Sequence, residues 1–302
     1  MIIVRLMGGL GNQMFQYAFG RRLAYERDVS LKLDAVTGFK YDCYNRSYRL
    51  NNLEIWEDFA SQKEIELFGS GDYSIISKMY HKSKNIVRPP SSKYKVIRER
   101  DSYLDSAMLN SCSSNMLIHG YWQSEKYFWP IKEIIKREFR VKHPLQGQNL
   151  SIAKKIRNTN SVCLHIRNYG LVDSEVNSKV SNKYELLGLD YYYNALNYLQ
   201  SKENGLHCFV FSDNPEWARQ YLQLSCPCTI VAHNHTNSGR EYEDLRLMSM
   251  CKHYIIANST FSWWGAWMGD HKGKLVIAPM RWYKNLKVKT EYLYPENWKL
   301  MD

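Results

Sequence analysis

A histidine and an arginine two positions apart, His165 and Arg167, follow an apolar run and are well suited to hold an anion. In a strand, alternate side chains point to the same face, so the two are expected to point the same way. The forked guanidinium of arginine binds a phosphate through two N–H groups, which an ammonium cannot do. Such a pair can also form a structural salt bridge, but its position at the first strand of the second half of the chain favours phosphate binding.

A run of hydroxyl residues, Ser259, Thr260 and Ser262, follows a second apolar segment and precedes a segment with helical periodicity. Ser259 or Thr260 is expected to cap this helix, whose first-turn amides and positive end would attract a second phosphate. A cap needs only one hydroxyl, so the additional ones favour a ligand.

Two neighbouring features of this half are less specific. Asp213 follows another apolar segment and precedes a proline and a helix-like stretch, so it is either a simple helix cap or a ligand-binding residue. Trp263, Trp264 and Trp267 have the spacing of a helix face, which predicts packing against a sheet rather than stacking on a ligand.

The amino-terminal glycine turn, residues 8–13, follows a short apolar strand and opens a helical pattern. It resembles a dinucleotide-binding fingerprint, with Asp34 at a plausible distance for a ribose, but Met14 occupies a position that requires glycine or alanine. A tight turn with close helix packing is the structural alternative. The adjacent amides of Asn12 and Gln13 favour hydrogen bonds to sugar hydroxyls or phosphate.

The sequence contains no zinc-ligand spacing, phosphate-binding P-loop, nucleophile elbow or D-x-D pair at a strand end. Nothing in it is therefore expected to hold a divalent metal against a diphosphate. We predict no metal site and no cofactor.

These residues must be positioned by two domains, because 302 residues is about twice the usual length of one domain. Apolar strands at 161–166, 206–211, 228–231, 253–257 and 274–277 alternate with helical segments at 190–200, 216–222, 242–250 and 260–268. Alternation of strand and helix predicts parallel sheets with helices on both faces. In the first half, strands are expected at 1–7, 29–34 and 116–120, and a helix at 131–139.

The predicted fold is therefore α/β, with two Rossmann-like doubly wound domains facing a cleft. A shift in composition at 141–150 places the boundary near residue 145, which gives domains at 1–145 and 146–302. The carboxyl-terminal tail is a candidate to pack back on the first domain. In such folds ligands bind at the carboxyl ends of the strands.

Composition describes an ordinary soluble protein with a basic surface. Lysine and arginine total 41 against 30 acids, giving a net charge of +11, and the excess is concentrated between Lys78 and Arg100. This region is either a solvated loop or a peripheral contact with anionic membrane. No apolar run is long enough to span a bilayer, and no nucleic-acid-binding module is present, so we expect a cytoplasmic or peripheral location.

The cysteines do not indicate a disulfide network or a metal site. The seven cysteines have scattered spacing, and only Cys226 and Cys228 lie close together in sequence. An odd, scattered set predicts neither a network of disulfides nor a zinc site.

Six motifs in order give the chain a resemblance to a known family. They are GGLGNQMFQYA at 8–18, GYWQS at 120–124, LHIR at 164–167, FSDNPEW at 211–217, DLRLMS at 244–249 and IANSTFSWWGA at 256–266. In these motifs the sequence resembles the bacterial α-1,2-fucosyltransferases of glycosyltransferase family 11, from Met1 to about Trp298.

The resemblance implies a GT-B-like fold, GDP-fucose as donor, no metal requirement and inversion at the sugar carbon. It also implies an α-fucosyl linkage on a galactose 2-hydroxyl, in surface polysaccharide or lipopolysaccharide O-antigen synthesis. The acceptor, a galactose-terminated glycan that is lipid-linked in some pathways, would bind the amino-terminal domain, and GDP-fucose the carboxyl-terminal one.

The candidate residues can then be assigned to the two substrates. Departure of GDP develops negative charge on the diphosphate, so fixed donors aimed at it supply most of the rate. The catalytic candidates are Arg167 and Asp173. The donor-binding candidates are Asn12, His165, Asp213, Ser259, Thr260, Phe261 and Ser262, and the acceptor-binding candidates are Gln13, Asp34 and Gln123.

One departure from the family pattern concerns catalysis. The family normally reads H-x-R-R-G-D, whereas this chain has Asn168 for the second arginine and Gly170 for the acid. Either Asp173 replaces the acid as the general base, or the acid has a binding or structural role, or the chain is inactive. Two alternatives outside the active enzyme remain: a catalytically silent nucleotide-sugar-binding protein, and a Rossmann oxidoreductase that Met14 disfavours.

Overall fold

The computed structural model describes residues 1–42, 44–69, 93–99, 114–167, 184–234, 239–285 and 290–302. They form two compact units. Unit 1 comprises Met1–Asn51 and Ile55–Glu138, and unit 2 comprises Asn52–Glu54 and Phe139–Asp302. The segment 52–54 belongs to unit 2 because it pairs with the start of that unit, where the amide of Glu54 donates to the carbonyl of Arg140 at 2.9 Å.

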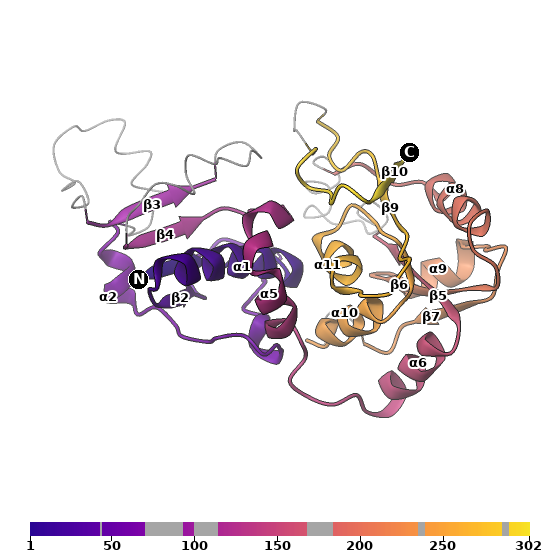
Figure 1. The fold of residues 1–302 in the computed structure, drawn as a ribbon, viewed down its shortest axis with the longest axis horizontal. Helices are drawn as coiled ribbons and strands as arrows, with labels where there is room; N and C mark the ends of the chain where they lie inside the picture. The colour runs from indigo at the N-terminus through magenta and orange to yellow at the C-terminus, as the bar shows by residue number, and fades with distance from the viewer. Residues whose placement is uncertain (43, 70–92, 100–113, 168–183, 235–238, 286–289) are drawn as a thin grey trace. The chain divides into compact units, whose positions relative to one another are not determined.

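Unit 1 is built on a four-stranded parallel sheet in the order β2-β1-β4-β3 (Figure 1). Its elements are β1 (Ile2–Arg5), α1 (Leu10–Arg27), β2 (Leu31–Asp34), the 3-10 turn η1 (Leu50–Asn52, which reaches into unit 2), α2 (Gln62–Glu66), β3 (Lys95–Arg98), β4 (Met116–His119), the 3-10 turns η2 (Glu125–Tyr127) and η3 (Trp129–Ile131), and α5 (Lys132–Glu138).

Helices cover both faces of the described sheet in unit 1. Ile3 and Leu117 pack with Ile65 of α2 and with Phe68, which follows it. On the opposite face α1 packs against β1, where Val4 lies close to Gly20. Because successive side chains of a strand point to opposite faces of the sheet, apolar residues on both faces can pack against these helices.

Unit 2 is built on a six-stranded parallel sheet in the order β10-β9-β8-β5-β6-β7. Its elements are α6 (Gly147–Arg157), β5 (Asn160–Ile166), α8 (Leu189–Gln200), β6 (Leu206–Ser212), α9 (Pro215–Tyr221), β7 (Cys228–Val231), α10 (Glu241–Ser249), β8 (His253–Ile255), α11 (Thr260–Met268), β9 (Val276–Pro279) and β10 (Lys299–Met301).

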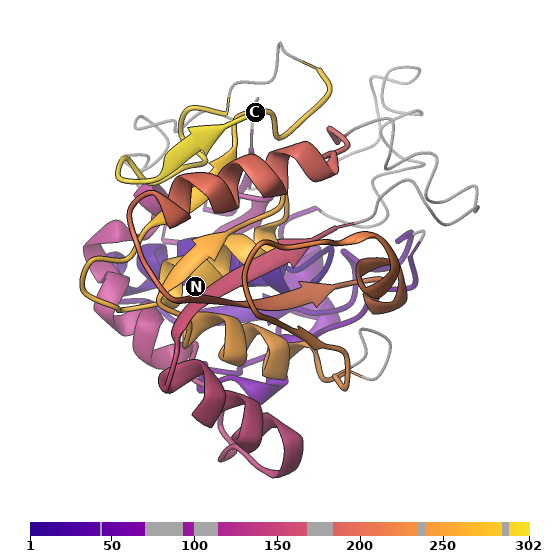
Figure 2. The same ribbon diagram turned by 90° about the vertical axis from the view of Figure 1, so that its right-hand side faces the viewer.

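The two faces of β5 meet different helices. Val162, Leu164 and Ile166 share a core with α8 and α9. Between them, the thiol of Cys163 lies beside Cys251 at the end of α10, and the ring of His165 lies 5.9 Å from that of Phe261 in α11. Figure 2 shows α8 on one side of these strands and α10 on the other. Residues at odd positions of β5 thus face the layer of α10 and α11.

The predicted order of strands and helices is confirmed wherever a strand is fully buried. One helix and two strands were not predicted: α6, whose polar sequence begins with Gly147 inside the shift in composition, the edge strand β3, and the three-residue β10. The carboxyl-terminal residues complete the sheet of unit 2, where the amide of Met280 donates to the carbonyl of Met301 at 2.7 Å. None of the helices in the described ranges is long and apolar enough to cross a membrane.

A close approach of α1 to β1 requires glycine at position 20. A Cβ atom built on Gly20 would lie 2.0 Å from Cγ2 of Val4 and 3.3 Å from Cδ1 of Leu31. Val4 is fully buried and cannot move aside without disturbing the sheet. The separation of helix and strand is therefore set by the missing side chain.

We predict that Gly20→Ala destabilises unit 1 by about 1–2 kcal/mol, because overpacking outweighs the better helix propensity of alanine. The measurement is denaturant unfolding followed by circular dichroism. Gly9→Ala is the matched control, since nothing lies within 4 Å of a Cβ atom at that position. An unchanged or raised stability of Gly20→Ala would show that the contact relaxes without cost.

Candidate functional site

The chain changes direction across the sheet of unit 2 between β5 and β8. From β5 it continues to β6 and β7 on one side, and then returns to β8, which pairs with the other side of β5. In open α/β sheets, ligands bind outside the carboxyl ends of the strands at such a switch point. His165 and Arg167 end β5, and residues 256–259 follow β8, so the predicted donor-side residues lie at this edge.

His165 is a buried histidine at the switch point. It is 4% exposed, and its Nδ1 atom has no hydrogen-bond partner among the described residues. Burial, together with the positive charge of Arg167, lowers the pKa of His165 to about 3. The imidazole is therefore neutral at physiological pH, with one nitrogen that donates and one that accepts.

Arg167 lies beside Asp213 at the adjoining strand end. The Nε atom of Arg167 is 3.2 Å from Oδ2 of Asp213, and both side chains keep partial exposure to solvent. The parallel register pairs Ile166 with Ser212, so the residues that follow them emerge side by side. Asp213 thus holds Arg167 at the edge of the sheet. The sequence predicted both residues as candidates for ligand binding, but it did not predict that they pair.

The start of α11 is the third component of this edge. Ser259 is the N-cap residue, as predicted, but its side chain makes no capping hydrogen bond. Ser262 is fully buried, and its hydroxyl donates to carbonyls of the preceding turn. Ser259, Thr260 and Phe261 are half-buried and present the first turn, whose amides favour an anion.

Buried side chains fix this helix in place. The side-chain amide of Asn258 donates to the carbonyls of Glu185 at 2.7 Å and Trp282 at 3.1 Å. Trp263 and Trp264 are fully buried and pack against each other with ring centroids 5.0 Å apart. The prediction that the tryptophans pack rather than bind is confirmed for the described structure.

In unit 1, two predicted residues meet at the equivalent switch point, between β1 and β4. The side-chain amide of Gln123 donates to Oδ1 of Asn12 at 3.0 Å. Asn12 lies in the first turn of α1, after a glycine turn in which Gly8 has a φ of 75°. Both side chains are half-buried. A residue predicted for the donor and one predicted for the acceptor are thus joined in one pair.

The backbone next to Gln123 is strained. Trp122 has a φ of 55°, which side-chain-bearing residues rarely adopt, and its indole N–H is buried without a partner among the described residues. The carboxylate of Glu99 holds this turn by accepting from the amides of Tyr121 at 2.7 Å and Trp122 at 3.0 Å. Glu99 and the backbone of Trp122 thus shape the turn that directly precedes Gln123.

Gln13 and Asp34 use their polar groups inside unit 1. The amide of Gln13 donates to the carbonyls of Gly8 and Ser47, and its oxygen accepts from the amide of Arg49. Asp34 is 1% exposed and pairs with Arg5, with Nε and Oδ2 3.0 Å apart. In this structure both residues stabilise the turns around the glycine motif.

Several predictions fall outside the described residues. Asp173, Asn168 and Gly170 lie in 168–183, and most of the basic stretch lies in 70–92. Within the described ranges, no group of three or more His, Cys, Asp or Glu side chains is placed to hold a metal ion.

Asp244, in the first turn of α10, is a candidate that the sequence interpretation missed. Burial raises the pKa of Asp244 to about 7, while a hydrogen bond from Asn234 at 2.9 Å opposes the shift. A buried carboxyl group with a strongly shifted pKa is a common mark of a functional site. Its motif was noted, but the partner of this carboxylate, Asn234, lies ten positions away outside the helix, so the motif alone does not single out Asp244.

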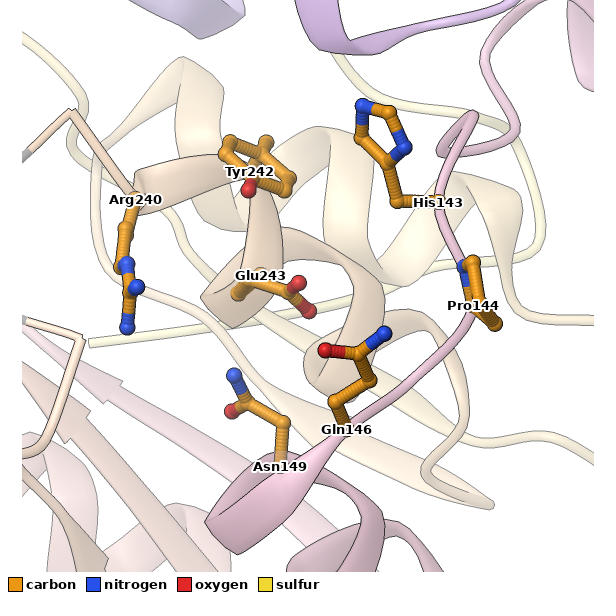
Figure 3. A pocket seen from close by; sticks show the side chains of 7 residues that line it. All are labelled: His143, Pro144, Gln146, Asn149, Arg240, Tyr242 and Glu243. Atoms are coloured by element: carbon orange, nitrogen blue, oxygen red, sulfur yellow. The ribbon is translucent and has the colours of Figure 1, made fainter.

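A polar pocket of about 340 Å³ lies beside this network (Figure 3). Side chains from the segment 143–149 face those from the start of α10, and Asn234, which exchanges hydrogen bonds with Asn149 and donates to Asp244, connects the two. The pocket is lined by His143, Pro144, Gln146, Asn149, Arg240, Tyr242 and Glu243. None of these was predicted, because they are far apart in sequence.

We predict a pH-dependent cost of burying Asp244. Its pKa in the folded protein exceeds the ordinary value of 3.8, so its contribution to stability is complete below pH 3.8 and is lost as the pH rises through 7. Asp244→Asn removes this titration. The free energy of unfolding of the variant, relative to the natural protein, should therefore rise by about 2–3 kcal/mol between pH 5 and pH 8.

The control for this comparison is Asp190→Asn, which changes an exposed acid in the first turn of α8. Its difference from the natural protein should stay nearly constant over the same pH range. A constant difference for Asp244→Asn as well would show that the carboxyl group is ionised without cost.

Comparison with known proteins identifies relatives over nearly the whole chain. The profile described as glycosyl transferase family 11 matches residues 72–302. An Escherichia coli protein named alpha-1,2-colitosyltransferase is 35% identical over 301 residues, which cover 98% of this chain and 97% of that protein. The Escherichia coli O-antigen biosynthesis glycosyltransferase WbnK is 32% identical over 302 residues, with 92% and 93% covered.

Among solved structures, a mutant of Arabidopsis thaliana FUT1 in complex with GDP matches with a TM-score of 0.54 and 12% identity. The match covers 100% of this chain and 76% of that one. At this identity it shows the fold, and the predicted GT-B-type architecture of two parallel-sheet α/β units is confirmed. The family profile and the identity to the two bacterial proteins show that this chain belongs to glycosyl transferase family 11.

Proposed function

We propose that this glycosyltransferase moves fucose from GDP-fucose to the 2-hydroxyl of a galactose residue, with inversion, during O-antigen synthesis. The observation that carries the proposal is the convergence of His165, Arg167 and the start of α11 at the switch point of unit 2. Two relatives support the class of reaction: one is named for α-1,2 transfer of colitose and the other for O-antigen biosynthesis.

The chemistry at this edge suits a diphosphate leaving group. As the bond between fucose and GDP breaks, negative charge grows on the diphosphate, and donors that are already in place stabilise it without reorganisation. Arg167 supplies a permanent charge that Asp213 orients. The first-turn amides of α11 would hold the second phosphate. With these groups to neutralise the charge, we propose that transfer needs no metal ion.

His165 suits the same role as a neutral group. Since its imidazole stays uncharged across physiological pH, its hydrogen bond to an anion would not change as the solution is acidified from pH 8 to pH 5. The Nδ1 atom, which has no hydrogen-bond partner among the described residues, belongs to a ring on the face of β5 that α11 covers. We assign His165 to donor binding and not to proton transfer.

The acceptor side is assigned to unit 1, where Gln123 and Asn12 form their pair. Gln13 and Asp34 would support that side by holding the turns around it. A base must collect the proton of the acceptor hydroxyl, but its contribution is modest if the sugar ring is already cation-like. For this reason we favour a binding or structural role for the acid that Gly170 replaces, over replacement of its function by Asp173.

A second candidate donor is nucleotide-linked colitose. The relative with 35% identity is named for colitose, which is fucose without its 3-hydroxyl. The two sugars differ by one hydrogen-bonding group, and a site built to bind that hydroxyl rejects the deoxy sugar strongly, whereas a site without such a partner accepts both.

We expect the purified protein to transfer fucose from GDP-fucose to galactose-terminated oligosaccharides, and to do so in excess EDTA. The experiment offers GDP-fucose and GDP-colitose in parallel, and reads out GDP release and the linkage of the product by NMR. Binding of either donor without turnover would favour the silent binding protein. Complete loss of transfer in EDTA, restored by a divalent ion, would contradict the metal-free proposal.

Arg167→Ala should lower kcat/KM by about 100- to 1000-fold or more, because a donor that acts in the transition state is lost. Arg167→Lys should recover little, since an ammonium lacks the forked geometry. Arg219→Ala is the matched control, because Arg219 is exposed on α9 and pairs only locally with Glu216 among the ion pairs of the described residues. Near-normal turnover of either Arg167 variant would exclude this residue from the mechanism.

A further inference from the structure

Two thiols lie in contact on the side of the sheet of unit 2 that α8 and α9 cover. The Sγ atoms of Cys208, in β6, and Cys226, just before β7, are 3.5 Å apart. Both are free cysteines in this structure. No part of the proposed transfer reaction uses them, since they lie at the amino ends of their strands, away from the edge that carries Arg167.

The two thiols have different surroundings. Cys208 is fully buried in the core shared with α8 and α9, whereas Cys226 packs at the margin of that core and keeps partial exposure. The hydrogen bond between them lowers the pKa of Cys226 to about 7 and, together with burial, raises the pKa of Cys208. Cys226 therefore has the thiolate character and the access to solvent of a reactive cysteine.

We propose that Cys226 is a peroxide-reactive thiol and that Cys208 is its resolving partner, so that the pair forms a reversible disulfide. An exposed, reactive cysteine next to a second cysteine that can displace its first oxidation product is the arrangement found in redox-sensing sites.

The chemistry balances with hydrogen peroxide as the oxidant. The thiolate of Cys226 attacks one peroxide oxygen, the O–O bond breaks, and a sulfenic acid and hydroxide form. The sulfur of Cys208 then attacks the sulfur of the sulfenic acid, its proton goes to the departing hydroxide, and water leaves. Two thiols lose two electrons to one peroxide, and two water molecules form once the hydroxide takes up a proton.

The bond would close a loop that contains a residue of the proposed donor site. Cys208 and Cys226 are 18 positions apart, and the chain between them contains the end of β6, Asp213 and α9. Because β6 continues from Cys208 to Ser212, the covalent link fixes the start of a strand whose other end precedes Asp213. The modification would restrain this segment without touching the diphosphate edge.

The experiment treats the purified full-length protein with hydrogen peroxide, alkylates the remaining thiols after denaturation, and identifies tryptic peptides by mass spectrometry. Cys208 falls in peptide 203–219, and Cys226 and Cys228 fall together in peptide 220–240. We expect a cross-link between these two peptides that dithiothreitol removes.

Three variants separate the cysteines. Cys228→Ser changes an exposed thiol on the same peptide, and its cross-link yield should stay within about twofold of the natural protein, whereas Cys226→Ser should lower the yield at least about tenfold. Cys208→Ala should also abolish the cross-link, and its effect on folding is controlled by its unfolding midpoint. Because this variant also removes the hydrogen bond that lowers the pKa of Cys226, Cys226 should react with peroxide more slowly and end at sulfenic or sulfinic acid.

Two outcomes would overturn the proposal. One is a cross-link that persists in Cys226→Ser, which would make Cys228 the partner of Cys208. The other is a natural protein in which Cys208 and Cys226 are both recovered alkylated while other thiols have been oxidised. Neither readout depends on transfer activity, so a failure here is distinct from a failure of the proposed function.

Discussion

The position of β5 between β6 and β8 is the constraint on which the rest of unit 2 depends. Parallel pairing on both sides makes the carboxyl ends of three strands emerge together, and the reversal of chain direction at β5 keeps a crossover helix from covering that edge. His165, Asp213 and Ser259 come from segments far apart in sequence, and only this pairing brings them to one place. The apolar alternation of β5 then decides that His165 faces α11 and not α8.

Much of this fold could be predicted because its strands are short, apolar and separated by helices with clear periodicity. The failures have a common cause. The residues of α6 carry a weak apolar stripe and start with a glycine, and β10 contributes only three residues whose pairing with β9 is a long-range event. Local sequence encodes propensity, but it does not encode which edge strand is available for pairing.

The sequence predicted candidate residues for the site, but it did not predict which residues they contact. Arg167 and His165 were singled out by chemistry, yet the carboxylate beside the arginine and the burial that keeps the histidine neutral depend on neighbouring strands. Gln13 and Gln123 illustrate the same limit, since both are amides near a glycine turn. One is enclosed with its hydrogen bonds satisfied by the protein, and the other reaches Asn12 from a strained turn.

The pair of Arg167 and Asp213 also bears on how tightly a nucleotide can be held. A guanidinium that already has a carboxylate neighbour binds anions more weakly than an isolated one. The carboxylate of Asp213 partly neutralises the positive charge of Arg167, and it repels an incoming phosphate. The carboxylate would also repel the nucleoside diphosphate product, which gains negative charge when the sugar is transferred. Asp213 therefore limits how strongly the enzyme would retain its spent nucleotide, which favours rapid exchange of product for fresh donor over tight storage of either.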